Sequence, residues 1–279
     1  MKKLLYLLLV LTILGCSSND DDSNDIDNND NNNILVSKIS YDDYELDSYS
    51  YEENFTYELN KIVQRLDVTY YNGSIQNTYR TQFIYSNDLI ARVDNYDEDD
   101  NLSSRTTFQY DSQSRLTLAE NCYYYNSICE QEDANSFSYN SDGTITRVST
   151  DSYSNESEEY TYQLNNQGNI VGLFLQSDDC EEIISINYDN NNTPFKNITG
   201  ANSLNVLFGG LSEGRVFGLS NNIKSIQDDI ICNNSSDNES LTINFSYDYT
   251  QDGYPRNIVE TVTEDGGSYT NTTILLEYN

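Results

Sequence analysis

Residues 137–148, Phe-Ser-Tyr-Asn-Ser-Asp-Gly-Thr-Ile-Thr-Arg-Val, decide the fold of this chain. The two aromatic residues at the start are two positions apart, so they face the same side of an extended strand. The Asn-Ser-Asp-Gly run that follows contains residues that tolerate a tight reversal of the backbone. The β-branched residues after it are typical of a returning strand. The segment therefore predicts a β-hairpin.

The spacing of the apolar residues in the returning strand predicts a second feature. Ile145 and Val148 are three positions apart, which would place them on opposite faces of a regular strand. A β-bulge would return both side chains to one face, and we favour that interpretation. The alternative is that Ile145 lies at the turn and packs from the loop.

The same unit recurs along the chain. Its instances begin at Phe55, Phe83, Phe108, Phe137, Tyr160, Ile186 and Phe245, and a last strand is Leu276-Glu277-Tyr278. The tyrosines of successive units are 28, 25, 29, 23 and 26 residues apart, then 59, then 31. A single hairpin buries little apolar surface, so neighbouring units must stack to form a core. We predict one all-β domain over residues 34–279, an antiparallel meander of about seven repeated β-hairpins.

Residues 199–225 interrupt the repeat with glycines and apolar residues, and Glu213 is the one acidic residue among them. Leu204, Leu207 and Phe208 have helical spacing, which predicts a short helix over about 202–208 that the following glycine pair ends. We expect this partly helical apolar insertion to cover one face or edge of the sheet. Lining a ligand cleft is the alternative.

The repeats resemble a known family. The recurring pattern F-x-Y-x-x-x-G-x-I-x-x-V is similar to YD-repeat (Rhs-type) hairpins, and Tyr110-Asp111, Tyr188-Asp189 and Tyr247-Asp248 retain the Tyr-Asp step. Residues 34–279 resemble uncharacterised lipoproteins of Bacteroidota with degenerate YD-like repeats, including a late segment like that at 193–198. The resemblance implies stacked hairpins and supplies no catalytic residue. The repeats of toxin cages are longer and more regular, so no such cage is implied.

Residues 1–16 form a targeting segment. Lys2 and Lys3 precede an apolar run, Leu4 to Leu14, that is too short to span a bilayer. The run leads into Ile-Leu-Gly-Cys at 13–16, which resembles a lipobox apart from its first two residues. The resemblance implies that Cys16 becomes an acylated N-terminus that anchors the protein in a membrane. An ordinary secretory peptide with an incidental cysteine is the alternative.

Residues 17–33 predict a disordered, acidic tether rich in Asn and Asp, because Ile26 is the one apolar residue among them. Ser17 and Ser18, followed by acidic residues at 20–22, resemble the signal that sends lipoproteins of Bacteroidota-type bacteria to the outer face of the outer membrane. We therefore expect a lipid-anchored outer-membrane protein that faces the cell exterior. A lipoprotein that faces the periplasm, or a tether that is acidic for solubility, remains open.

Four cysteines remain besides Cys16, and an exported chain with an even number of them favours two disulfides. Three pairings are possible, and we favour Cys122–Cys129 with Cys180–Cys232, because the first pair flanks a short loop. Zinc binding is disfavoured because no C-x-x-C motif occurs. Free thiols remain an alternative.

The composition excludes several classes of function. The chain has no His, which excludes Ser-His-Asp and Cys-His catalysis and His-ligated metals. A formal charge of −32 argues against nucleic acid as a partner, because binding it needs clustered cations. Asp94, Asp97, Asp99 and Asp100 have no EF-hand spacing, so we interpret them as a solvated turn. We expect no metal and no cofactor.

Three functions remain. The first is a non-catalytic surface module that binds a glycan, a peptide or a partner protein, because the chain's 25 tyrosines offer flat amphipathic faces. The absence of Trp weakens the glycan version. The second is a structural cell-surface repeat protein without a small ligand. The third is a carboxylate-dependent hydrolase, since 46 acidic residues could place two carboxyls together. We favour the first and expect no enzymatic activity.

Overall fold

A computed structural model describes residues 34–42, 48–151, 157–177, 179–207, 211, 220–234, 238–264 and 267–279. Residues 31–279 belong to one compact unit. The targeting segment, Cys16 and the tether up to residue 33 lie outside the described residues, so their assignments stay predictions. In the part described, no helix is both long enough and apolar enough to cross a membrane.

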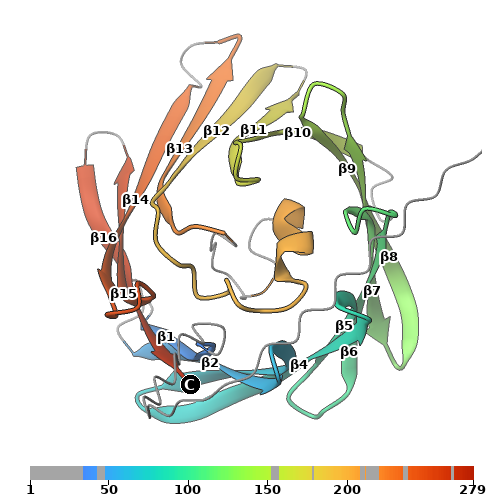
Figure 1. Ribbon diagram of the computed structural model, residues 1–279, viewed down its shortest axis with the longest axis vertical. Helices are drawn as coiled ribbons and strands as arrows, with labels where there is room; N and C mark the ends of the chain where they lie inside the picture. Colours follow the sequence, from blue (N-terminus) through green and yellow to red (C-terminus); the bar gives the residue numbers. More distant parts are fainter. Residues whose placement is uncertain are drawn as a thin grey trace, which may run out of the picture. The chain divides into compact units, whose positions relative to one another are not determined.

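The described residues of this unit form sixteen strands that close into a barrel (Figure 1). The strands are β1 (Val36–Asp42), β2 (Tyr49–Glu58), β3 (Lys61–Tyr71), β4 (Ser74–Ser86), β5 (Leu89–Tyr96), β6 (Leu102–Tyr110), β7 (Leu116–Tyr125), β8 (Ile128–Tyr139), β9 (Ile145–Asp151), β10 (Ser157–Leu164), β11 (Ile170–Gln176), β12 (Cys180–Tyr188), β13 (Ile223–Cys232), β14 (Glu239–Tyr249), β15 (Pro255–Glu264) and β16 (Gly267–Tyr278).

Every strand pairs antiparallel with its neighbours in sequence, which confirms the all-β meander of hairpins. The meander closes because β1 pairs with β16, with Ile39 opposite Leu276. The sequence predicts a last strand at residues 276–278, with no returning strand after it. The partner is the strand at 36–42, which lacks the aromatic-x-Tyr signature of the repeats.

β-Bulges explain the three-residue spacing in most of the repeats. In β5 the register passes from Ile90 to Arg92 and skips one residue, so Ile90 and Val93 face the same side. Equivalent shifts occur where β3, β7, β11, β13 and β15 begin. The expectation was wrong for the hairpin at 137–148 itself. Its register is unbroken from Ile145 to Val148, so those two side chains lie on opposite faces.

The two ends of the barrel differ. At one end, which we call the plug end, lie the turns near residues 60, 88, 113, 142, 167 and 252, together with the long segment 189–222. At the other, which we call the hairpin end, lie the remaining turns, including those at Asn72-Gly73 and Asn126-Ser127. Because the sheet is a meander, turns alternate strictly between the two ends.

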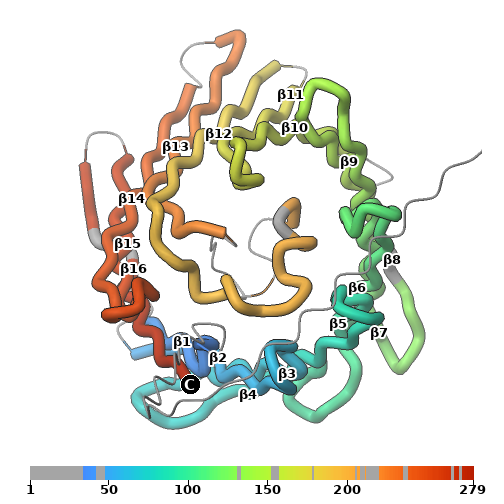
Figure 2. The backbone as a smooth tube through the Cα atoms, viewed as in Figure 1, coloured from blue at the N-terminus to red at the C-terminus, as the bar shows by residue number. Residues whose placement is uncertain are grey.

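The described residues of segment 189–222, namely 189–207, 211 and 220–222, lie inside the barrel, and we call them the plug (Figures 1 and 2). It contains a short 3₁₀ helix, η2 (Ala201–Leu207), close to where a helix was expected. Phe195, Leu204 and Leu211 are fully buried and join the core that the strands form. The insertion therefore begins earlier than expected and packs within the barrel, because the closed sheet offers its apolar inner face. The glycine pair at 209–210 lies outside the described residues.

The plug fits closely against the wall at Gly200. Its backbone has φ +81°, and an added Cβ would lie 2.7 Å from the carbonyl oxygen of Asp88. A larger residue would therefore meet backbone as well as an unfavourable conformation. Next to it, the backbone N–H of Thr199 donates to Asn60 O at 2.8 Å, and the Tyr85 hydroxyl donates to Thr199 O at 3.2 Å.

Six of the repeated tyrosines have a common structural role. Their hydroxyls donate to a backbone carbonyl at the start of the odd-numbered strand of the preceding hairpin. These bonds are Tyr57 to Val36, Tyr110 to Ile90, Tyr139 to Leu116, Tyr188 to Ile170, Tyr247 to Ile223 and Tyr278 to Pro255. We call these six residues the tyrosine ring. They link successive hairpins at the plug end, which accounts for the periodicity of the sequence.

Candidate functional site

The outward face of the barrel wall is mostly polar. Phe55 of β2 packs on Phe195 of the plug with ring centroids 6.1 Å apart, so the residues that alternate with it face outward. Following the register around the wall gives the outward charged residues Lys38, Glu52, Glu58, Arg80, Arg92, Asp94, Arg105, Glu120, Glu159, Glu181, Asp229 and Glu277. Outward apolar residues such as Leu66, Phe174 and Leu275 are scattered among them.

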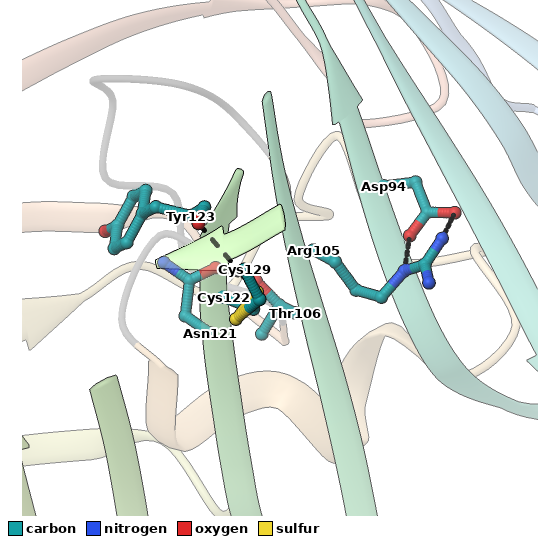
Figure 3. The surroundings of a disulfide bond; sticks show 7 residues. All are labelled: Asp94, Arg105, Thr106, Asn121, Cys122, Tyr123 and Cys129. Atoms are coloured by element: carbon teal, nitrogen blue, oxygen red, sulfur yellow. Dashed lines mark hydrogen bonds and ion pairs between the residues drawn. A yellow bond between two sulfur atoms is a disulfide. The ribbon is translucent and has the colours of Figure 1, made fainter. Parts of the chain in front are cut away.

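Several of the outward charges pair across neighbouring strands. The Arg105 guanidinium meets both carboxylate oxygens of Asp94, with Nε to Oδ1 at 2.6 Å (Figure 3). Lys38 Nζ lies 2.5 Å from Glu277 Oε1 across the closing pair of strands. These contacts give Asp94 a structural role. The interpretation as a solvated turn was wrong for Asp94, which is buried within β5, because its carboxylate pairs with the arginines of the wall. In the turn itself, Asp100 pairs with Arg80 and Asp97 accepts hydrogen bonds.

The structure joins Cys122 to Cys129 and Cys180 to Cys232, the pairing that the sequence favours. The first bridge spans the β7–β8 hairpin, near Arg105 (Figure 3). The second joins β12 to β13, where its two cysteines are register partners. No group of three His, Cys, Asp or Glu residues within the described ranges could hold a metal ion.

A cavity of about 580 Å³ lies in the lumen beyond the plug. The part of the cavity nearest the plug is apolar and is lined by Leu207 of η2 and by Phe83 and Phe108 of the wall. The part nearer the hairpin end is polar, because the inward positions change from apolar to polar residues along the same strands. The polar, uncharged lining residues include Thr81, Asn95, Ser103, Ser104, Thr106 and Asn135.

Two inward arginines line this cavity. Arg65 is buried and forms a two-pronged ion pair with Asp67, with Nε to Oδ1 at 2.7 Å and Nη2 to Oδ2 at 2.9 Å. Its Nη1 also donates to the carbonyl of Leu211 at 3.0 Å, which ties the cavity wall to the plug.

Arg147 has a different environment. Its Nε donates to Asn135 Oδ1 at 2.7 Å, and its Nη1 donates to the hydroxyl of Tyr162 at 3.2 Å. The guanidinium carbon lies 5.0 Å from the ring centroid of Tyr160. The Tyr160 hydroxyl donates to Glu158 at 2.6 Å, and that bond raises the pKa of Tyr160 to about 12.

Strands β13 to β15 form another part of the barrel wall, across the lumen from β5 to β8 (Figure 1). A cavity of about 420 Å³ there is lined by Asp228, Glu239, Glu260 and Glu264 from β13 to β15. Burial, and then the nearby Asp228, raises the pKa of Glu182 above its ordinary value. Burial, and then Asp229, likewise raises the pKa of Asp228, whose Oδ1 has no hydrogen-bond partner. Inward carboxylates therefore extend from Glu158 on β10 to Glu264 on β15, and Arg147 on β9 lies at one end of this acidic wall.

The sequence did not identify these lumen residues. Arg147, Glu182 and Asp228 were not singled out, because a polar residue in a strand gives no sign of which face it takes. Regular alternation from Ile145 would place Arg147 inward, but the β-bulge that we favoured places Val148 there instead.

Comparisons with known proteins identify the fold. No protein-family model matches the chain, and no curated protein matches it. The similar solved structures include a porin-like protein from Bacteroides uniformis ATCC 8492, with TM-score 0.55, 12% identity and coverage of 88% of this chain and 98% of that one. They also include a porin-like protein from Bacteroides vulgatus ATCC 8482, with TM-score 0.55, 14% identity and coverage of 88% of this chain and 99% of that one. At these identities the likeness shows the fold: the chain is a closed antiparallel barrel like theirs.

Proposed function

We propose that this protein is a lipid-anchored, non-catalytic binding barrel of the outer membrane that takes its ligand into the lumen at the hairpin end. The observation that carries the proposal is the divided lumen. A plug and an apolar core fill one half, and a polar cavity of about 580 Å³ occupies the other. Ligand sites are commonly concave spaces of this size with apolar walls and a few placed polar groups.

The polar outward face supports a barrel that lies in water. A barrel that spans a bilayer carries an outward apolar band about 25 Å tall, and an outward Arg or Lys at the bilayer midplane costs about 2–4 kcal/mol. Here charged outward residues such as Arg92 and Arg105 lie within the strands rather than beyond their ends. The likeness to porin-like proteins therefore extends to the barrel, and we do not extend it to a pore through lipid.

The start of the described chain supports an orientation. Ile34 and Leu35 lie at the plug end, where Asn197 Nδ2 donates to Ile34 O at 2.9 Å and Asn279 N donates to Leu35 O at 3.0 Å. A tether from Cys16 would therefore join the barrel at its plug end. Its seventeen residues, 17–33, could extend to at most about 60 Å. This arrangement favours a hairpin end that points away from the membrane, toward the cell exterior.

Two measurements test this proposal. Cys16→Ala protein should be released in soluble form, and protease applied to intact cells should digest the wild-type protein. Digestion only after lysis would leave a lipoprotein that faces the periplasm. A glycan and peptide binding screen with the Cys16→Ala protein tests the lumen. If it retained no ligand at micromolar concentration, a structural surface protein would replace the binding module.

The raised pKa values of Glu182 and Asp228 favour hydrolysis as a second candidate function, because a general acid needs a raised carboxyl pKa. Release of reducing sugar from an incubated oligosaccharide, and its loss in Glu182→Gln and Asp228→Asn variants, would establish that candidate. Binding without turnover supports the non-catalytic role.

A further inference from the structure

We infer that Arg147 forms an anion subsite in the lumen cavity, and that the ligand is an acidic saccharide: a sugar that presents one carboxylate to Arg147 and several hydroxyls to the polar wall. This inference rests on the proposed function, since it names the ligand class of the same cavity.

The first argument is the charge of Arg147. The chain has 46 acidic and 14 basic residues, and most of its arginines pair with a carboxylate. The paired arginines are Arg65, Arg80, Arg92, Arg105 and Arg115. Arg147 faces the lumen, and within the described ranges no carboxylate forms an ion pair with it. Glu158, the acidic residue next to its stacking partner, accepts from the Tyr160 hydroxyl.

The second argument is orientation. Asn135, Tyr162 and Tyr160 fix the guanidinium through two hydrogen bonds and a stacked ring. A guanidinium has five N–H donors, and these contacts use two of them. The remaining donors have no acceptor among the side chains that the structure describes. A fixed guanidinium of this kind matches a carboxylate, which it binds through two parallel hydrogen bonds.

The third argument is the remainder of the cavity. Thr81, Asn95 and Ser104 form a chain of hydrogen bonds, with Thr81 Oγ1 to Asn95 Oδ1 and Asn95 Nδ2 to Ser104 Oγ both at 2.9 Å. Hydroxyls and amides held in this way can exchange hydrogen bonds with sugar hydroxyls. Phe83 and Phe108 offer apolar surface to the C–H face of a sugar ring. A bare inorganic anion would leave both features unused.

The opposite wall sets the direction of the ligand. Asp228 and Glu260 line the acidic cavity on the far side of the lumen, where a carboxylate would be repelled. The other inward arginine of the cavity, Arg65, is neutralised by Asp67. The carboxylate of the ligand is therefore directed to Arg147, and its hydroxyls extend from there.

Calorimetry with the full-length protein in detergent tests the subsite. The probes are digalacturonate, its methyl ester and inorganic phosphate. We expect digalacturonate to bind about 10- to 100-fold more tightly than the ester, the range that a charge-assisted hydrogen-bonded pair contributes. This comparison alters the ligand alone, so it does not depend on any variant folding.

Variants then assign the effect to one residue. Arg147→Gln should bind digalacturonate about 10- to 100-fold more weakly and bind the ester as the wild type does. Arg256→Gln is the matched control, because it makes the same charge change at an exposed site at the plug end, and it should bind both probes normally. Unchanged thermal unfolding establishes that Arg147→Gln is folded.

The outcomes separate the two proposals. Equal binding of acid and ester, or normal binding of the acid by Arg147→Gln, would overturn the anion subsite and leave the binding function standing. Binding of phosphate but of neither saccharide would overturn the ligand class. If no probe bound, this inference would fail, and the ligand screen described above would decide the binding function separately.

Discussion

The two ends of the barrel are built by the same strands and differ in what their inward side chains do. Toward the plug end the inward residues of β3, β5 and β7 include Ile62, Ile90 and Leu116, which are completely buried. Toward the hairpin end the inward residues of β4, β5 and β6 include Thr81, Asn95 and Thr106, which line the lumen cavity. Near the plug end, the inward side chains of these strands therefore pack in the apolar core. Near the hairpin end, the inward side chains of the same strands line the lumen.

This difference shows how a single repeat can supply both an apolar core and an open lumen. The strand alternation continues unbroken from one end to the other, so the inward face stays inward. Only the residue type changes, as in β4, where Phe83 is followed toward the hairpin end by the inward residues Thr81 and Tyr79. Stability should therefore respond to changes at the plug end, and recognition to changes at the hairpin end.

High pH should give the largest effect, through the tyrosine ring. Burial raises the pKa values of Tyr57, Tyr188, Tyr247 and Tyr278 above the ordinary value near 10. Their contribution to stability is fully present below pH 10 and is lost as the pH rises above it, because the unfolded chain ionises first. At about 1.4 kcal/mol per pH unit each, the four should remove about 5 kcal/mol by pH 11.

Denaturant unfolding across this pH range measures the effect. Tyr247→Phe should lose stability less steeply above pH 10, whereas Tyr125→Phe at the hairpin end should follow the wild-type curve. Identical slopes for all three proteins would show that the tyrosine ring does not control alkaline stability.

The two disulfides should differ in the stability that they contribute. The Cys180–Cys232 bridge closes a loop of 52 residues that contains the whole plug, whereas Cys122–Cys129 closes a loop of 7. On loop-closure entropy, removing the first with a double Ser variant should cost about 4 kcal/mol and removing the second about 2 kcal/mol. Chemical denaturation of the two double variants checks this order. Equal losses of stability would mean that the longer loop, which contains the plug, gives the Cys180–Cys232 bridge no advantage.

A matched pair of isoleucines tests the core directly. Ile62→Ala at the plug end should destabilise the fold by about 2–5 kcal/mol, because it leaves a cavity in a packed region. Ile75→Ala at the hairpin end should change stability by less than about 0.5 kcal/mol. Thermal or urea unfolding measures both, and a large loss for Ile75→Ala would contradict the division of the barrel.

A pair of glycines gives the smallest effect. Gly200 and Gly73 both have positive φ, but an added Cβ meets the Asp88 carbonyl at Gly200 and nothing within 4 Å at Gly73. Gly73→Ala should cost about 1 kcal/mol from backbone strain alone. Gly200→Ala should cost more, because the plug must also move away from the wall. Similar unfolding midpoints for both variants would indicate that the plug adjusts freely.

The sequence predicted the local structure well and the assembly less well. Aromatic-x-Tyr pairs, turn residues and three-residue spacings are local signals, so hairpins, meander and most bulges followed from them. Closure did not follow, because it depends on β1, whose residues lack the repeat signature. The start of the plug at residue 189 was missed for a similar reason: its Asn-rich beginning resembles an ordinary turn, and only the closed wall gives it an interior to fill.

The hairpin at 137–148 shows why the lumen site escaped prediction. Its unbroken register puts Arg147 inward, where a bulge would have placed Val148. The choice between an apolar and a charged inward residue therefore depends on one skipped residue in the strand pairing, which no local sequence signal specified.

The pairing of β1 with β16 also determines when the fold can be completed. Residues 36–42 must meet residues 274–278, so the final seam joins segments about 240 residues apart in the chain. Contacts of such high sequence separation form slowly, because the chain entropy that they cost must be met before they are made. Until that seam forms, both terminal strands expose unpaired backbone that could join another chain. Once it forms, none of the sixteen described strands is an edge strand. The newly made chain is therefore open to pairing with other chains until β1 and β16 meet, and the finished barrel is not.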